Sequence, residues 1–287
     1  MAGGASVLIS RHLGSDAARA SLEDDLARRL NESGRTVLIT PHLYHLPHGS
    51  DAWSEIAAFD GDLAVAGWIS PRSLECLLRE YAHREPVAAF DLSATESADE
   101  AFTSISDALG SAPVVRTPSS AHERIRELDL PVTERWYPVL DRSRCTSCRH
   151  CLQFCLFGVY DVVDRQVVAV LPDNCKNGCP ACARVCPQGA VIFPLSDEPA
   201  IAGMPGTIMR PDAAARRMYY VRTGRRCPVC GEVAQAGSPP EGVATCEECG
   251  GPLGQPAATT PEPSPVHEEI DALIDALDDL AAGGGGE

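Results

Sequence analysis

The chain has 287 residues, enough for two or three domains, and carries a net charge of −16 at neutral pH. This acidic balance argues against general binding to nucleic acid, which needs cationic side chains to displace phosphate counterions. The sequence has no run of roughly 20 apolar residues that could span a bilayer. The first residues also lack the basic segment of a secretory signal. We therefore expect a cytoplasmic protein.

Residues 1–116 alternate between short apolar runs and helical patterns. The runs are nearly continuous in hydrophobicity and partly β-branched, which is typical of buried parallel strands. They lie at 6–10, 36–40, 63–69 and 87–92, with a weaker run at 113–116. Helix starts are indicated by Ser15, by Ser70 before Pro71, and by a capping box at 97–100. This alternation predicts a doubly wound α/β domain.

The rest of the chain divides by composition into a multidomain α/β plus α+β arrangement. A connector is expected at 117–135, with a short helix around 121–128. The following segments are a cysteine-rich domain at 136–195, a linker at 196–222, a second cysteine module at 223–253, a Pro/Thr/Ala-rich disordered linker at 254–265 and an acidic helix at 266–281.

Twelve of the thirteen cysteines fall into three compact groups, and Cys76 stands alone. In a reducing compartment, clustered cysteines indicate ligation of metals or clusters rather than disulfides. Cys76 lies inside a helical pattern, and we interpret it as a small core residue rather than a catalytic thiol.

The first two cysteine groups have the spacing of cubane-cluster ligands. A cubane cluster needs four converging thiolates, three of which can come from a tight loop and the fourth from elsewhere in the chain. The groups read Cys145-x2-Cys148-x2-Cys151-x3-Cys155 and Cys175-x3-Cys179-x2-Cys182-x3-Cys186-Pro187.

Over residues 136–195 this pattern closely resembles the bacterial two-[4Fe-4S] ferredoxins. The resemblance implies a pseudo-two-fold module with a hairpin between the groups, at 159–163 and 166–171. Two departures are the extra residue between Cys175 and Cys179 and Leu156 in place of proline. The resemblance also implies two crossed ligand sets, Cys145, Cys148, Cys151 and Cys186 for one cluster, and Cys175, Cys179, Cys182 and Cys155 for the other.

The third group looks like a zinc ribbon. Two Cys-x2-Cys-Gly knuckles are separated by 15 residues and can supply a closed tetrahedral site. Zinc is the expected occupant, with a rubredoxin-like single iron as the alternative. Two disulfides or unligated thiols are a further alternative. The four ligands are Cys227, Cys230, Cys246 and Cys249.

Four histidines are expected near the carboxyl ends of the first two strands, where open α/β sheets bind ligands. They could bind a metal or a substrate or transfer protons, or they could simply be polar loop residues. The loop after the first strand carries no glycine-rich phosphate motif. These histidines are His12, His42, His45 and His48.

Residues 266–281 carry apolar side chains at helical spacing among acidic ones. An isolated helix of this length is marginal in water, so we expect it to dock in a groove of this protein or of a partner. A solubilising acidic tail is the alternative.

Together these patterns predict an electron carrier or electron-transfer subunit that passes single low-potential electrons between partner oxidoreductases. One alternative is an oxidoreductase with a substrate or cofactor site on the N-terminal domain. Another is a redox-responsive regulator acting through the ribbon or the tail. The sequence identifies no catalytic residue, and it leaves the redox partners, the potentials and the oligomeric state open.

Overall fold

The computed structural model describes residues 5–59, 61–110, 125–211, 213–224, 226–227, 229–235, 237 and 242–253. The chain forms two compact units, Met1–Tyr219 and Tyr220–Glu287, which are considered separately below. In the described residues, no helix is both long and apolar enough to cross a membrane. The expected strand at 113–116 and the expected acidic helix at 266–281 lie outside the described residues.

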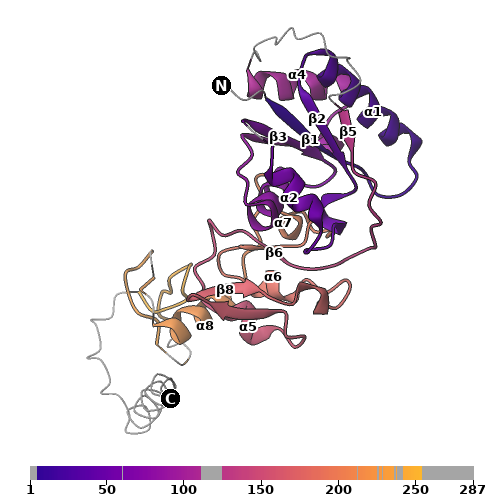
Figure 1. Cartoon of the computed structure of the whole chain (residues 1–287). Coiled ribbons are helices and arrows are strands. Elements are labelled where there is room, and N and C mark those ends of the chain that lie inside the picture. The colour runs from indigo at the N-terminus through magenta and orange to yellow at the C-terminus, as the bar shows by residue number, and fades with distance from the viewer. Residues whose placement is uncertain are drawn as a thin grey trace, which may run out of the picture. The chain divides into compact units, whose positions relative to one another are not determined.

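The larger unit begins with a five-stranded parallel sheet in the order β4-β3-β1-β2-β5 (Figure 1). Its mixed α/β class and its parallel sheet were both predicted from the apolar runs. The strands are β1 Ser6–Ser10, β2 Thr36–Thr40, β3 Leu63–Gly67, β4 Ala88–Asp91 and β5 Ile125–Glu127.

The prediction of a helix around 121–128 is wrong for residues 125–127. These residues form the edge strand β5, in which Ile125 pairs with Val37 of β2 in parallel register. Ile125 packs against the apolar core on one face of the sheet. Pairing with a distant strand outweighs the weak local helical pattern here.

Helices cover both faces of the sheet. Alternate strand residues explain this, since Leu8 and Leu38 contribute to one core whereas their neighbours Val7 and Val37 contribute to the other. The helices α1 and α4 pack on the second face, and α2 and α3 pack on the first. Their bounds are α1 Ala17–Glu32, α2 Asp51–Ala57, α3 Pro71–Leu77, which continues as a π-helical turn Leu78–Ala82, and α4 Ala98–Leu109.

The helix caps follow the sequence signals with one shift. Ser70 and Ser97 cap α3 and α4 as predicted. The cap of α1 is Asp16 instead of Ser15, because the Asp16 carboxylate accepts hydrogen bonds from the amides of Ala18 and Arg19.

The cysteine-bearing part of the larger unit consists of short elements around two small antiparallel pairs. Strand β6 pairs with β9, and β7 pairs with β8 as the predicted hairpin. The elements are β6 Val139–Leu140, α5 His150–Phe154, β7 Tyr160–Val163, β8 Gln166–Ala169, a 3-10 turn Pro172–Asn174, α6 Ala181–Val185, β9 Val191–Ile192, α7 Pro199–Ala202 and α8 Ala213–Thr223, the last of which runs into the second unit.

The hairpin turn between β7 and β8 is strained. Asp164 and Arg165 both have positive φ, 49° and 63°, as a two-residue type I′ turn requires. Arg165 has a Cβ that disfavours this conformation by about 1 kcal/mol.

We expect Arg165→Gly to raise the free energy of unfolding by up to about 1 kcal/mol, measured by thermal unfolding under anaerobic conditions. Arg149→Gly is the control, because Arg149 also has a positive φ, of 64°. It tests whether a positive φ alone is enough for glycine to raise the free energy of unfolding. A lower melting temperature for Arg165→Gly would contradict the strain argument.

The sheet layer and the cysteine-bearing segment share one hydrophobic core. Tyr44, which follows β2, stacks on Tyr137 with ring centroids 4.3 Å apart. Its hydroxyl donates to the Tyr137 carbonyl at 2.6 Å and accepts from the Tyr137 amide at 2.7 Å. Val139 of β6 and Ile192 of β9 belong to the same core. The cysteine-bearing segment is therefore anchored to the sheet layer and is not a free-standing module.

A buried ion pair fastens the same two parts. Arg72 of α3 donates to the Asp141 carboxylate at 2.7 Å and to the Gly189 carbonyl at 2.7 Å. Burial alone would raise the pKa of Asp141, but hydrogen bonds from Ser143 and Arg72 hold it below its ordinary value. Asp141 directly precedes the first cysteine loop, so the pair fixes that loop relative to the sheet.

Candidate metal centres

The first cysteine loop runs from the end of β6 into α5. Ser147 and Arg149 adopt left-handed backbone conformations, with φ of 52° and 64°, and so wind the chain tightly between its cysteines. Cys151 lies on α5, and Cys155 follows the helix directly. Three of the four sulfurs of the group can thus face a common point while the fourth is directed elsewhere.

The structure brings the first expected ligand set together around one small enclosed cavity. Gln188, Ala190 and Val191 complete its wall on the side of β9. The Ala190 amide donates to the Cys186 sulfur at 3.2 Å, an orienting contact of the kind that tunes ligating thiolates. The four cysteines in this wall are Cys145, Cys148, Cys151 and Cys186.

The second expected set lines a separate cavity of about 310 Å³. The Tyr160 hydroxyl donates a hydrogen bond of 3.1 Å to the Cys182 sulfur. Gly178 has a φ of 75° and accommodates the extra residue between Cys175 and Cys179 without removing either from the wall. The four cysteines here are Cys155, Cys175, Cys179 and Cys182.

The chemistry of these sulfurs fits a cationic iron cluster better than free thiols. All thirteen cysteines are free of disulfides. Burial and neighbouring thiols raise the pKa of Cys175 to about 12, and burial also raises the pKa of Cys182 to about 12. Such groups become thiolates at neutral pH only when positive charge is bound among them. The residues present therefore fit an iron–sulfur cluster.

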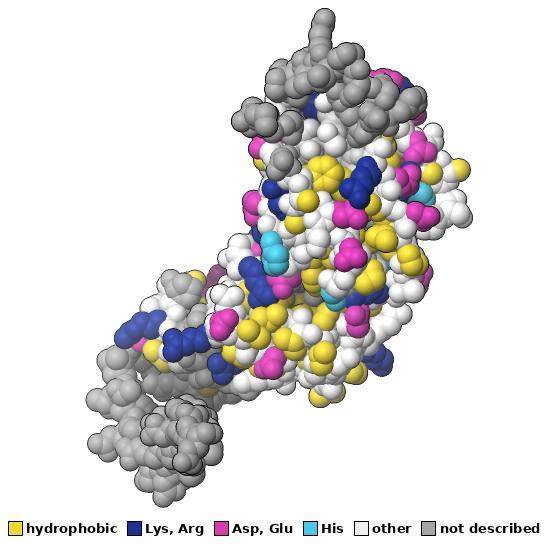
Figure 2. All heavy atoms as spheres, in the orientation of Figure 1, with side chains coloured by type: hydrophobic (Ala, Val, Ile, Leu, Met, Phe, Trp, Pro, Cys, Tyr) yellow, Lys and Arg dark blue, Asp and Glu magenta, His cyan; other side chains and the backbone are white. Residues whose placement is uncertain are grey.

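The surface around the second cavity is apolar. Phe154 is 52% exposed, Leu156 is 91% exposed and Phe157 is 39% exposed, and all three line the cavity mouth. Figure 2 shows hydrophobic side chains gathered over the face of the larger unit where α5 and β8 lie in Figure 1. Leu156 occupies the position at which the resemblance leads us to expect proline, so this departure adds exposed apolar surface next to a cysteine.

The second unit contains the predicted site with four cysteines. The sulfurs of Cys227 and Cys246 are 3.8 Å apart and those of Cys230 and Cys249 are 3.6 Å apart. A tetrahedron with metal–sulfur bonds of about 2.3 Å has edges of about 3.8 Å. In the parts of the chain that the structure describes, this is the group of ligating side chains close enough to share one metal ion. It is called the ribbon site below.

Each half of the ribbon site is a short turn closed by an isolated β-bridge. The glycine after each second cysteine has a positive φ, 75° at Gly231 and 60° at Gly250, as the knuckle pattern predicts. Burial alone would raise the pKa of Cys246, but amide hydrogen bonds from Cys249 and Glu248 lower it to about 7. Cys246 is thus favoured as a thiolate, whereas burial raises the pKa of Cys230 and of Cys249.

The four histidines do not form one cluster. His12 contacts the Glu23 carboxylate through Nδ1 at 3.0 Å. His42 and His45 have ring centroids 5.1 Å apart. His48 stacks on Tyr81 instead, with centroids 4.6 Å apart. The four histidines therefore do not form one shared metal site.

Two partners of these histidines carried no sequence signal. Glu23 is fully buried although it lies in a charged helical segment, and it also accepts a hydrogen bond from Trp68 at 2.7 Å. Arg135 donates its backbone amide to His45 at 2.8 Å and its guanidinium to His48 at 2.8 Å. Cys76, in contrast, is buried in α3 as predicted, and burial raises its pKa to about 12.

Comparison with known proteins finds similarity to ferredoxins over about a fifth of the chain. The chain is 43% identical over 60 residues to an uncharacterized ferredoxin of Methanocaldococcus jannaschii, a match that covers 21% of this chain and 41% of that protein. It is 30% identical over 74 residues to Ferredoxin-3 of a Nostoc species, covering 20% of this chain and 75% of that protein. No model of a known protein family matches the chain, and no solved structure matches it either.

Proposed function

Because the chain belongs to the ferredoxin family through its cysteine-rich segment, we propose that it carries two [4Fe-4S] clusters and passes single low-potential electrons between partner oxidoreductases. The observation that carries this proposal is the pair of separate cavities, each lined by four cysteines. Their membership matches the crossed sets that the ferredoxin pattern implies. The matched ferredoxin of Methanocaldococcus is more than twice as long as the aligned part, so the activity of the whole chain is part of the proposal.

When bound, each cluster supplies reversible one-electron chemistry. The chain's own groups adjust the sulfurs around it. The Tyr160 hydroxyl and the Ala190 amide each donate a hydrogen bond to a cysteine sulfur, which withdraws charge and favours the reduced state. One donor belongs to each set, so both sites are tuned by the fold.

The two sites differ in the residues that surround them. Gln188, Ala190 and Val191 line the first cavity, whereas the exposed Phe154, Leu156 and Phe157 line the second. Apolar surface beside a redox centre is suited to a transient partner interface. We therefore propose that partners exchange electrons at the second set and that the first set lies further along the route.

We propose zinc for the ribbon site, in a structural role, with a single iron as the alternative. The support is the near-tetrahedral sulfur spacing and the closed geometry of the two turns. The acidic segment at 266–281 stays a proposal as a partner-docking helix.

Anaerobic purification followed by iron, sulfide and zinc analysis tests this function. We expect about eight iron, eight sulfide and one zinc per chain. A finding of four iron or fewer in fully reconstituted protein would remove the second cluster. Nine iron without zinc would instead make the ribbon site a third redox centre. Protein that turned over a substrate without any partner would contradict the role of electron carrier.

A further inference from the structure

A pocket of about 580 Å³ opens at the carboxyl ends of β1, β2 and β5. Its walls are residues 11–14 after β1, 41–42 after β2, and 127–129 and 132 after β5. Open parallel sheets bind their ligands at this edge, and the volume is that of a site for a small organic molecule. The cysteine sets lie elsewhere, so this pocket is not part of the proposed electron-transfer centres.

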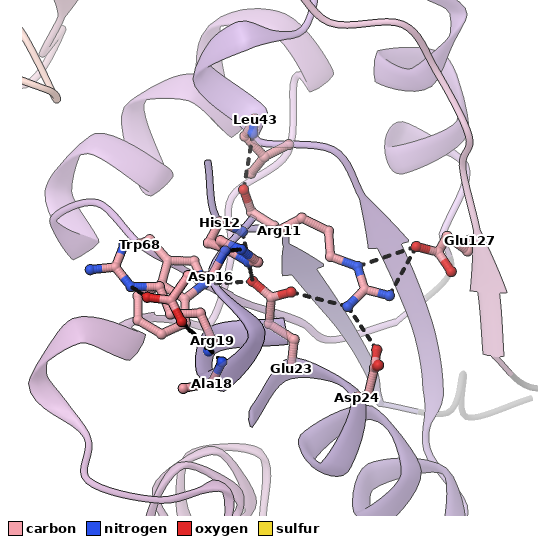
Figure 3. Close-up of polar contacts among 11 residues, drawn as sticks. Arg11, His12, Asp16, Ala18, Arg19, Glu23, Asp24, Leu43, Trp68 and Glu127 are labelled. Carbon is pink, nitrogen blue, oxygen red and sulfur yellow. Dashed lines mark hydrogen bonds and ion pairs between the residues drawn. The ribbon is translucent and has the colours of Figure 1, made fainter. Parts of the chain in front are cut away.

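Two features that would bind an anion at this edge are both already occupied. Figure 3 shows the Arg11 guanidinium held among three carboxylates, with donor–acceptor distances of 2.7 Å to Asp24, 3.0 Å to Glu23 and 2.9 Å to Glu127. The amino end of α1 is filled by the Asp16 side chain, which accepts from two of its first amides. Arg11 and two of the first amides of α1 are therefore already paired, which disfavours a phosphate or carboxylate ligand there.

The pocket walls carry excess negative charge. Glu127 and Asp129 both line the pocket and both are exposed. Arg11 contacts Glu127 only at Oε1, so Oε2 remains able to accept from a ligand. Because Arg11 is shared with Glu23 and Asp24, it does not neutralise this wall.

A buried, neutral imidazole forms part of the wall. His42 lines the pocket and is 2% exposed, and its Nδ1 is enclosed by protein atoms. Burial lowers the pKa of His42 to about 3, so its ring stays neutral and adds no positive charge to the wall at neutral pH.

The carboxylates and imidazoles of this pocket do not form a metal site. Among the described residues, the group close enough to share one ion is the ribbon site in the other unit. Leu13, Leu128 and Val132 add apolar walls that a metal ion would not use. The arrangement suits a molecule with an apolar body and a positively charged, hydrogen-bond-donating group.

We propose that this pocket binds a small organic cation of the amine or amidine class. Its N–H groups donate to Glu127 and Asp129. Its apolar part lies against Leu13, Leu128 and Val132. This site is independent of the proposed electron transfer, and it gives the sheet layer a ligand of its own.

The test uses two rings of the same size and opposite charge, benzamidine and benzoate, titrated calorimetrically into the full-length protein with clusters and zinc in place. We expect benzamidine to bind at least about tenfold more tightly than benzoate, the equivalent of one charge-assisted hydrogen bond. The double variant Glu127→Gln, Asp129→Asn should weaken benzamidine by at least about tenfold. The same variant should strengthen benzoate, because Arg11 loses one carboxylate partner.

Asp107→Asn on α4 serves as the matched control, since it removes an exposed carboxylate outside the pocket and should leave both affinities unchanged. Tighter binding of benzoate or inorganic phosphate than of benzamidine would overturn the proposal. So would benzamidine affinity that survives the double variant, or no binding of either ring. Iron and sulfide content, measured on the same samples, reports separately on the electron-transfer function.

Discussion

Replacing Cys145 and Cys186 together with alanine is expected to leave one intact, reducible [4Fe-4S] cluster per chain. Both residues line the first cavity, so the crossed assignment removes two ligands from one cluster and none from the other. The matched double variant, Cys145→Ala with Cys155→Ala, takes one ligand from each set. We expect that protein to hold no cluster with four cysteine ligands.

The measurement is electron paramagnetic resonance of dithionite-reduced protein, quantified against iron and sulfide content. Both variants remove two thiols from the same segment, so a general loss of folding would affect them alike. If ligands were instead taken within each sequence group, the outcomes would be exchanged. An intact cluster in the Cys145/Cys155 variant and none in the Cys145/Cys186 variant would therefore refute the crossed sets.

Arg72→Met is expected to lower the free energy of unfolding by about 3 kcal/mol, because it leaves the Asp141 carboxylate buried without its main partner. The Asp141 side chain is 5% exposed, and Arg144 at 3.6 Å remains as a weaker neighbour, which places the loss at the lower end of the range for broken buried pairs. The Gly189 carbonyl loses its donor as well. The melting temperature of anaerobically purified protein measures the loss.

Arg28→Met is the control, because Arg28 is 54% exposed and pairs only with exposed carboxylates on its own helix. That change should leave the melting temperature nearly unchanged, because exposed ion pairs contribute little to stability. Removing both partners, as Arg72→Met with Asp141→Leu, should restore part of the stability, since no charge is then left buried. Equal losses in Arg72→Met and Arg28→Met would show that the Arg72–Asp141 pair does not hold the two parts together.

Local patterns accounted for much of the fold and for the grouping of the cysteines. The runs at Ser6–Ser10 and Thr36–Thr40 are strands because buried parallel strands need nearly continuous apolar residues. The serine and proline signals at Ser70 and Pro71 mark the start of α3. The spacing of the cysteines reflects ligand geometry within a few residues, so it can be interpreted without knowledge of the rest of the chain.

Long-range contacts could not be predicted in the same way. Tyr44 and Tyr137 are 93 positions apart, and nothing in either local pattern indicates that their rings stack. The edge strand at Ile125–Glu127 exists because β2 offers it a partner, which the local sequence does not encode. Glu23 reads as one more acidic residue of an exposed helix face, and its contacts with Arg11, His12 and Trp68 explain its burial.

The core shared by Tyr44, Tyr137, Val139 and Ile192 makes one wall of the sheet layer part of the cysteine-bearing segment. That segment has few helices and strands. Its loops surround cysteine thiols whose pKa is raised by burial, as at Cys175 and Cys182. Where iron is scarce, these loops lack the proposed clusters that would hold them in place. The apolar face of the sheet would then be exposed to chaperones and proteases. We therefore expect the cellular level of the whole protein, including its sheet layer, to fall with the iron supply.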